Sequence, residues 1–357
     1  MVHDGPAGAT ATTTPVAVAA TPDGAEIARA ATILEAGGLV AFPTETVYGL
    51  GADAENPAAV AKIFQIKGRP SNHPVIVHLA PEADLGYWVQ RVPPAAQSLI
   101  DAFWPGPLTL ILPRADEIPA AVAGGQNTIG VRCPSHPVAM ALLRAFRGGQ
   151  GGVAAPSANK FGHVSPTLAA HVRAEFASEL GAMLPMVLDG GASQVGIEST
   201  ILDLSRWHSH GPVLLRPGHI SAAQIATVLG REPQAPDASA PRASGTLASH
   251  YAPHTPVVLL ERDMLVQRAG QLQQKGQRCA VLLHQMEAPP GVAALCRLPA
   301  NGVGYAHGLY AALRELDQSN SFVILIEAPP HGAEWSGIND RLARAAHGSE
   351  AILAPFS

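Results

Sequence analysis

The sequence predicts an α/β protein in two parts, a mixed sheet with packed helices followed by a smaller α/β domain. The chain has 357 residues, which is more than one ordinary domain needs. In the first part, predicted strands outnumber predicted helices and some strands follow one another directly, which favours a mixed sheet over a strictly parallel one. After residue 256, strands and helices alternate regularly, as is typical of a small, mostly parallel sheet.

The ordered part of the chain is predicted to begin at Thr21-Pro22, because threonine can cap a helix and proline suits its first turn. Apolar residues then recur at helical spacing, at Ile27, Ala30, Ala31 and Leu34. Residues 1–20 are rich in Ala, Thr and Pro and are interpreted as a loose tail. They lack the basic start and long apolar run of a secretory signal.

The remaining elements of the first part follow from apolar runs and helical periodicity. Strands are predicted at residues 39–42, 75–79, 108–112, 128–132, 153–155, 186–189, 199–204 and 213–216. Helices are predicted at residues 56–66, 93–103, 137–146, 167–180 and 221–229. In the second part the predicted order is strand 257–260, helix 264–274, strand 279–283, helix 305–316, strand 322–326 and helix 338–346.

A proline-rich stretch separates the two parts. Between residues 231 and 256, five prolines interrupt any helix or central strand, so the stretch is interpreted as an interdomain linker. It nevertheless carries Ser249-His250-Tyr251, an unusual cluster for a passive spacer. The predicted organisation is therefore a tail at 1–20, a catalytic domain at 21–230, a linker at 231–256 and a small α/β domain at 257–357.

The composition narrows the class of protein. A formal net charge of -5 does not indicate a cationic face for tight nucleic-acid binding. The three cysteines are scattered without C-x-x-C spacing, which favours a reducing, cytoplasmic setting over disulfides or a zinc cluster. No uninterrupted apolar stretch reaches the roughly 20 residues of a membrane span.

Polar residues gather where predicted strands and helices end, which is where α/β sheets collect ligands. Thr44-Glu45-Thr46 follow the strand at 39–42, although a polar turn would look the same. Lys67 and Arg69 end the helix at 56–66, where they could clamp phosphate oxygens or simply favour the helix dipole.

Further candidates lie on or after later strands. Thr128 and Arg132 share one side of a strand, and a half-buried arginine needs either a protein carboxylate or an anionic ligand. Ser157, with Ser165 beyond it, follows the strand at 153–155, as a ligand loop or an ordinary Pro-Ser turn. Two last clusters are Gly196 to Asp203, which enters a strand, and Leu215-Arg216-Pro217-Gly218, which leaves one.

Several common catalytic motifs are missing from the sequence. There is no G-x-x-x-x-G-K-[ST] loop, no G-x-S-x-G elbow and no H-E-x-x-H helix, which disfavours P-loop, α/β-hydrolase and zincin chemistry. Gly302-Val303-Gly304 only half matches a dinucleotide fingerprint.

Taken together, these segments resemble the YrdC-like family of threonylcarbamoyl-AMP synthases. The match covers roughly residues 25–229, and P-T-E-T-V-Y-G-L-G at 43–51 with K-G-R-P-S-N-H-P at 67–74 is its most specific part. Residues from 256 onward look like the extra domain of the family's long form. Where the family's linker often has K-Y-R, this chain has Leu247-Ala248-Ser249, which leaves His250 and Tyr251 as the linker's candidates.

The resemblance implies a YrdC-like mixed twisted sheet with helices, plus a smaller Rossmann-like C-terminal domain. It implies that threonine, bicarbonate or CO2 and ATP, with Mg²⁺ on the phosphates, yield threonylcarbamoyl-AMP and pyrophosphate in the cytoplasm. A partner enzyme would then transfer the threonylcarbamoyl group to an adenosine of transfer RNA. Weak or no direct binding of transfer RNA by this chain is expected.

The resemblance also assigns residues. Those expected to contact threonine are Thr46, His78, Arg132, Ala155 and Thr200, with Ser199 as the alternative to Thr200. Those expected to contact ATP are Lys67, Arg69, His73, Thr128, Ser157, Ser165, Arg216 and His250, with Asn72 as the alternative to His73. Lys67 and Arg69 would also be catalytic by offsetting negative charge, and no metal ligand is assigned.

Two other functions would use a similar domain or the same cleft. Hydrogenase-maturation carbamoyltransferases contain similar domains, but also zinc-finger and acylphosphatase-like segments that this sequence lacks. A non-catalytic RNA-binding module could use the same Lys67/Arg69 cleft. The linker, with His250-Tyr251 inside it, is predicted to fold over the nucleotide as a lid.

Overall fold

The computed structural model describes residues 22–356. Its first helix, α1 (Gly24–Glu35), begins later than predicted. Asp23 is the N-cap: its side chain accepts the backbone N–H of Glu26, and the Glu26 side chain accepts the N–H of Asp23. Pro22 was predicted to lie in the first turn of this helix, which is wrong, because Pro22 precedes the cap. Thr21, predicted as the cap, lies outside the described residues.

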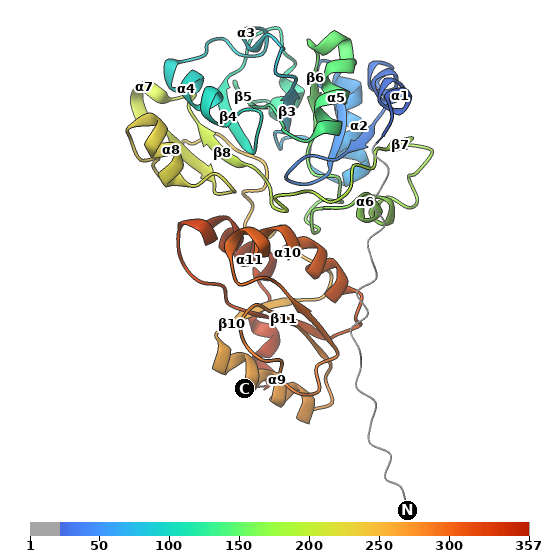
Figure 1. Cartoon of the computed structure of the whole chain (residues 1–357), viewed down its shortest axis with the longest axis vertical. Helices are drawn as coiled ribbons and strands as arrows, with labels where there is room; N and C mark the ends of the chain where they lie inside the picture. The colour runs from blue at the N-terminus through green and yellow to red at the C-terminus, as the bar shows by residue number, and fades with distance from the viewer. Residues whose placement is uncertain (1–21, 357) are drawn as a thin grey trace, which may run out of the picture.

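The first part of the chain forms one nine-stranded sheet with the order β7-β1-β2-β6-β3-β5-β4-β8-β9 (Figure 1). The pairs β1·β7, β3·β5 and β4·β8 are parallel and the other pairs are antiparallel. The predicted mixed sheet is therefore confirmed. Its strands are β1 (Val40–Phe42), β2 (Gly49–Asp53), β3 (Ile76–Leu79), β4 (Leu108–Pro113), β5 (Thr128–Arg132), β6 (Gly152–Ala154), β7 (Met186–Val187), β8 (Thr200–Asp203) and β9 (Val213–Arg216).

Helices cover this sheet and close two hydrophobic cores. One core contains apolar side chains from α2 and α4, including Ile63 and Leu99. A separate core contains α1 and α5, with Leu34 and Leu142 among its fully buried residues. Burial of these apolar stripes is what holds the helices against the sheet. The remaining α-helices of the first part are α2 (Pro57–Lys67), α3 (Leu85–Trp88), α4 (Pro94–Phe103), α5 (Pro137–Ala145), α6 (Ala169–Glu175), α7 (Trp207–His210) and α8 (Ala222–Leu229).

Strand β2 was not predicted, because its glycines and alanine are weak strand formers. The close approach of neighbouring side chains explains the glycines: a Cβ on Gly51 would lie 2.9 Å from Phe42 Cε1 and 2.9 Å from Val153 Cγ1. The predicted helix at 167–180 was too long, since α6 ends at Glu175.

The second part forms a parallel four-stranded sheet with the order β10-β13-β11-β12, as expected for a Rossmann-like domain. Helix α9 packs on one face, through Leu265 and Leu272, and α10 and α11 pack on the other. Strand β12 lies at the edge and was not predicted. The elements are β10 (Val257–Leu260), α9 (Arg262–Gln274), β11 (Cys279–Leu283), β12 (Ala294–Arg297), α10 (Gly302–Asp317), β13 (Val323–Glu327) and α11 (Ser336–Ala346).

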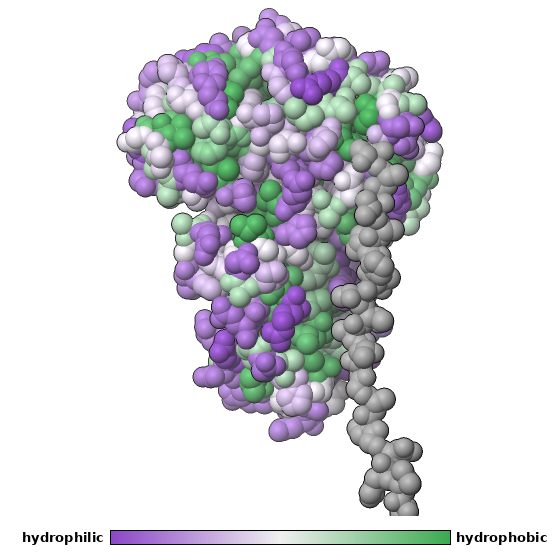
Figure 2. Space-filling model, in the orientation of Figure 1, coloured by the Kyte–Doolittle hydropathy of each residue, from purple (hydrophilic) through white to green (hydrophobic). Residues whose placement is uncertain are grey.

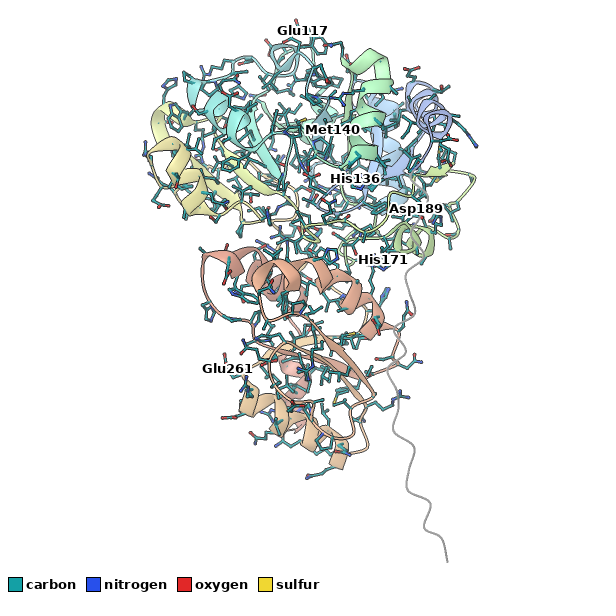
Figure 3. The ribbon with its side chains drawn as sticks, viewed as in Figure 1. Glu117, His136, Met140, His171, Asp189 and Glu261 are labelled. Carbon is teal, nitrogen blue, oxygen red and sulfur yellow. The ribbon has the colours of Figure 1, made fainter. Side chains whose placement is uncertain are left out.

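Helices α10 and α11 lie between the two sheets and face the first part of the chain (Figure 1). Figure 2 shows a mainly hydrophilic surface with small apolar patches on both parts. In Figure 3, His171 lies where the parts meet and Glu261 lies on the second part. Burial, followed by the charge of Arg314 on α10, lowers the pKa of His171 to about 4. Among residues 22–356, no helix is both long and apolar enough to cross a membrane.

Candidate active site

A cavity opens beside the large sheet. Strand ends, the end of α2 and the linker all contribute to its wall, so segments distant in sequence meet there. Most of the residues predicted as site residues line it, namely Thr46, Lys67, Arg69, His78, Arg132, Ala155, Ser157, Arg216 and His250.

The other predicted residues lie beside the cavity. Thr200 is fully buried and its Oγ1 donates to Ile220 O at 2.7 Å, whereas its neighbour Ser199 lines the cavity. Ser165 Oγ donates to Glu198 Oε1 at 2.5 Å.

The last two of these residues, Thr128 and His73, lie next to the cavity without lining it. Thr128 lines an adjoining cavity that shares Ile76 and Ser244 with the main one. His73 packs edge-on against Phe161, a lining residue, with 5.4 Å between ring centroids.

Two cations at the end of α2 reach the cavity because the helix stops at Gly68, a left-handed C-cap with φ 62°. Lys67 Nζ donates to Ser157 O at 2.7 Å and also to Asn159 O. Arg69 Nη2 donates to Pro74 O at 2.7 Å, while its buried Nε has no hydrogen-bond partner among the described residues. Burial, reinforced by the charge of Arg69, holds the pKa of Lys67 well below its ordinary range.

Arg216 adds a third buried cation at the end of β9. Its Nη2 donates to Ser199 O at 2.8 Å and its Nη1 to Ser244 O at 2.9 Å. Burial lowers the pKa of Arg69 to about 10, so Arg69 stays cationic at neutral pH, and burial also lowers the pKa of Arg216. Three buried cations that contact mainly neutral oxygen atoms favour an anionic ligand.

Arg132 forms a second polar group with the loop that follows β1. Its Nη2 lies 2.6 Å from Glu45 Oε1, its Nη1 donates to Thr46 Oγ1 at 3.0 Å and its Nε donates to Gly106 O at 3.2 Å. The sequence left a protein salt bridge and a ligand as alternatives, and in the described residues the salt bridge is formed. His78 lies nearby, and burial with the charge of Arg132 lowers its pKa to about 3, so its ring is neutral.

The linker closes one side of the cavity through Ser244, Gly245, His250 and Tyr251. Gly245 has φ 73°, and a Cβ there would lie 2.0 Å from Tyr251 Oη and 2.8 Å from Arg216 Nη1. His250 packs edge-on against Tyr251, with 4.2 Å between ring centroids.

The chain also matches known proteins. Residues 32–218 match the family model described as "Telomere recombination", and residues 220–347 match the model described as "Threonylcarbamoyl-AMP synthase, C-terminal domain". The chain is 39% identical to the threonylcarbamoyl-AMP synthase of Bacillus subtilis over 337 residues. The alignment covers 90% of this chain and 93% of that protein. The chain belongs to the threonylcarbamoyl-AMP synthase family.

Two further members support the same conclusion. The threonylcarbamoyl-AMP synthase of Pyrococcus abyssi is 36% identical over 88% of this chain and 92% of its own length. A crystal structure of P. abyssi Sua5 complexed with L-threonine superposes with a TM-score of 0.83 at 34% identity, covering 91% of this chain and 95% of that one. The family resemblance, the fold class and the enzyme class predicted from the sequence are therefore confirmed.

Sequence reasoning missed several residues at the site of this synthase-family member. Glu45 sits inside the most specific motif, and its pairing with Arg132 would have been a reasonable prediction. Glu198 was quoted within a candidate cluster but given no role, although it lines the cavity. Ser244 and Gly245 were given no role, because only the path of the linker brings them to the cavity.

Proposed function

We propose that this chain joins L-threonine, bicarbonate or CO2 and ATP into threonylcarbamoyl-AMP and pyrophosphate. The observation that carries the proposal is a single cavity lined by three buried cations, Lys67, Arg69 and Arg216, and by a separate arginine group around Arg132. Polyphosphate suits the first set and an amino-acid carboxylate suits the second.

Threonine is proposed to bind at the Arg132 group. The guanidinium already contacts a protein oxygen atom through each of its three nitrogens. Nη1 and Nη2 each keep a second N–H, which would hold the carboxylate as a bidentate pair. Thr46 and neutral His78 would contact the amino acid, as would Ser199 or Thr200, and Ala155 would leave room for it.

ATP is proposed to bind along the three cations. Lys67, Arg69 and Arg216 would contact its phosphates, supported by Ser157 and His250 from the cavity wall. The others assigned to ATP, which lie at the edge of the cavity or in the adjoining one, are His73, Thr128 and Ser165. Asn72 stays the alternative to His73.

The proposed reaction needs no covalent intermediate with the enzyme. The neutral amino group of threonine first adds to the carbon of CO2 and loses one proton, which gives a carbamate. Where bicarbonate is the source, it supplies the CO2 by taking up a proton and losing water. A carbamate oxygen then attacks the α-phosphorus of ATP as the bond to the bridging oxygen breaks, and pyrophosphate leaves with that oxygen. Positioning of the two reactants and charge neutralisation by Lys67 and Arg69 would supply the rate enhancement.

Mg²⁺ is proposed only as the counter-ion of ATP. Among the described residues, no group of three or more His, Cys, Asp or Glu side chains is placed to hold a metal ion. Glu198 lines the cavity, but both of its carboxylate oxygens already accept hydrogen bonds from the protein. The donor set therefore fits a cation carried on phosphate oxygens and not a dedicated protein site.

The linker is proposed to act as a lid over the nucleotide. Gly245 and His250 are buried in the cavity wall, whereas Leu247, Ala248 and Ser249 between them are exposed. A segment held at both ends with an exposed middle can open without unfolding either domain.

The product is proposed to pass to a partner enzyme that transfers the threonylcarbamoyl group to transfer RNA in the cytoplasm. With a net charge of -5, this chain would itself bind RNA weakly or not at all. The competing function is a non-catalytic RNA-binding module, which would show salt-dependent RNA binding without ATP turnover.

The deciding experiment is pyrophosphate release from ATP by the purified chain with Mg²⁺, with and without threonine and bicarbonate. Release that requires both is the expected result. ATP binding without threonine-dependent release would overturn the substrate assignment and favour the competing function.

A further inference from the structure

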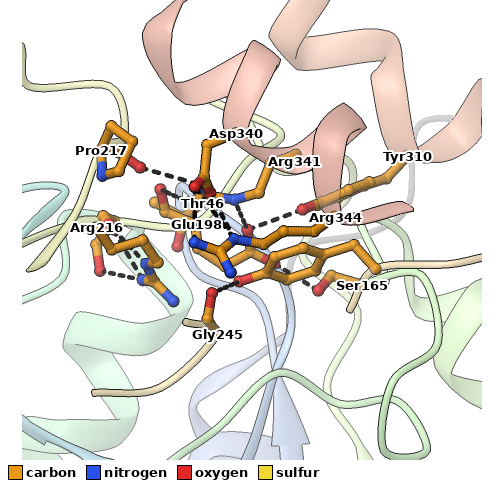
Figure 4. A network of polar contacts seen from close by, with 12 residues as sticks. Thr46, Ser165, Glu198, Arg216, Pro217, Gly245, Tyr310, Asp340, Arg341 and Arg344 are labelled. Carbon is orange, nitrogen blue, oxygen red and sulfur yellow. Dashed lines mark hydrogen bonds and ion pairs between the residues drawn. The ribbon is translucent and has the colours of Figure 1, made fainter. Parts of the chain in front are cut away.

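A buried network joins the C-terminal helices to the wall of the cavity (Figure 4). Glu198, in the loop before β8, lines the cavity and is 7% exposed. Its Oε2 accepts hydrogen bonds from Tyr310 Oη on α10 at 2.8 Å and from Arg341 Nε on α11 at 2.7 Å. Its Oε1 accepts the bond from Ser165. Two helices of the second part therefore hold a carboxylate that belongs to the first.

Arg341 also holds the backbone next to Ser199 and next to Arg216, two residues that line the cavity. Its Nη1 donates to Pro217 O at 2.9 Å and its Nη2 lies 3.4 Å from Glu198 O. Glu198 directly precedes Ser199, and Pro217 directly follows Arg216. Arg216 and Ser199 are themselves joined, since Arg216 Nη2 donates to Ser199 O at 2.8 Å. Arg341 therefore contacts the chain next to each of these two hydrogen-bonded residues.

The helices approach these loops backbone to backbone. A Cβ on Gly337 of α11 would lie 3.1 Å from Gly218 Cα. A Cβ on Gly196, which has φ 82°, would lie 2.3 Å from Ala306 O on α10. With so little free space, α10 restricts the position of the loop at Gly196 and α11 restricts the position of the turn at Gly218.

The network also determines the ionisation of Glu198, which lines the cavity. Burial by itself opposes ionisation of Glu198, but the charges of Arg341 and Arg216 outweigh it and hold the pKa of Glu198 at about 2. Arg341 is 1% exposed and also pairs with Asp340 at 2.7 Å. Without Arg341, the nearby cation left to compensate Glu198 would be Arg216. A buried carboxylate whose partner is removed is strongly unfavourable.

We propose that Arg341, supported by Tyr310, is a positioning residue of the active site. By holding Glu198 and Pro217 it keeps Arg216 available for the phosphates of ATP, although it does not line the cavity itself. The inference rests on the proposed function, since it assigns the C-terminal helices a part in ATP binding by the same site.

The test compares full-length Arg341→Met, Arg341→Lys and Tyr310→Phe with the wild type. Arg262→Met is the matched control, because Arg262 lies on α9, on the opposite face of the C-terminal sheet. With ATP varied, Arg341→Met should raise the KM for ATP about tenfold or more. The free-energy cost of removing one partner of a buried ion pair is larger than the free energy that corresponds to a tenfold change in affinity. Arg341→Lys and Tyr310→Phe should show smaller increases, and Arg262→Met should match the wild type.

A double variant separates positioning from a general loss of structure. Adding Glu198→Gln to Arg341→Met removes the uncompensated charge, so the KM for ATP should return toward the wild-type value even where the melting temperature stays low. Folded Arg341→Met with a wild-type KM for ATP would overturn the inference. So would an activity loss that only tracks the melting temperature and that Glu198→Gln does not relieve.

Failure of the proposed function would be distinct from failure of this inference. If the wild type shows no threonine-dependent pyrophosphate release, the proposed function fails. The affinity of each variant for ATP, measured by calorimetry without threonine, then still tests the inference: equal affinities of Arg341→Met and the wild type overturn it, and a tenfold weaker variant supports it.

Discussion

Glu45 and Arg132 form a buried ion pair, with 2.6 Å between Glu45 Oε1 and Arg132 Nη2 and both side chains 4% exposed. Glu45 also accepts the backbone N–H of Ser135 at 3.1 Å, so the loop after β1 and the end of β5 are joined at one point. The proposed threonine site is built around this pair.

Glu45→Gln should lower the free energy of unfolding by about 3 kcal/mol, because it leaves the charge of Arg132 buried without its partner. Denaturant unfolding of the ligand-free protein measures this. Glu82→Gln is the matched control: its ion pair with Arg144 is half exposed on both sides, and no measurable change is expected. Equal behaviour of the two variants would show that the buried pair does not stabilise the fold.

Arg69→Ala should lower kcat/KM for ATP by about 10²–10³-fold, because it removes a buried positive charge from the proposed phosphate site. Threonine-dependent pyrophosphate release measures the loss, and circular dichroism checks that the fold is retained. Arg173→Ala, which breaks a partly exposed pair with Asp189, serves as the control. Near-normal turnover of Arg69→Ala would rule out this role.

Gly245→Ala should raise the KM for ATP while leaving the two sheets folded. The added Cβ would lie 2.0 Å from Tyr251 Oη, so the linker could no longer pack against Arg216 as it does here. Gly230→Ala is the control, because Gly230 is also left-handed, at φ 65°, but has open space around it. That control should cost about 1 kcal/mol of backbone strain and leave the KM for ATP unchanged.

Limited proteolysis tests the lid directly. The exposed segment at residues 247–249 should be cleaved in the free protein, and ATP with threonine should slow that cleavage. Cleavage near Ala248 at the same rate with and without both ligands would count against a lid.

The stability of the fold should fall as the pH falls below 6.5, partly because of His78. Its pKa is about 3 in the folded chain, against an ordinary value of 6.5. Between these values the unfolded chain binds a proton that the folded chain does not, so His78 contributes a slope of about 1.4 kcal/mol per pH unit. His78→Gln should reduce the slope of unfolding free energy between pH 6 and 4 by that amount. An unchanged slope would mean that His78 is protonated in the folded chain.

The local features of the sequence determined much of the architecture and the chemical character of the site. Apolar runs and Gly or Pro at their ends predicted most strands, because burial and backbone conformation are local preferences. Lys67 and Arg69 at the end of a predicted helix, and Arg132 on a predicted strand, indicated an anion site, with the helix dipole and a protein salt bridge as the respective alternatives. The same reasoning could not find β2 or β12, since a glycine-rich strand and an edge strand form only when neighbours pair with them.

The tertiary structure alone decided which side chains meet. It brought Ser199 to the cavity while Thr200, one position along, turned to Ile220, and it placed Ser244 and Gly245 beside Arg216. It also paired Glu198 with Arg341, 143 residues away in the chain. The physical reason is that periodicity reports which face of an element is buried, whereas the partner of a buried charge is set by the packing of elements that are distant in sequence.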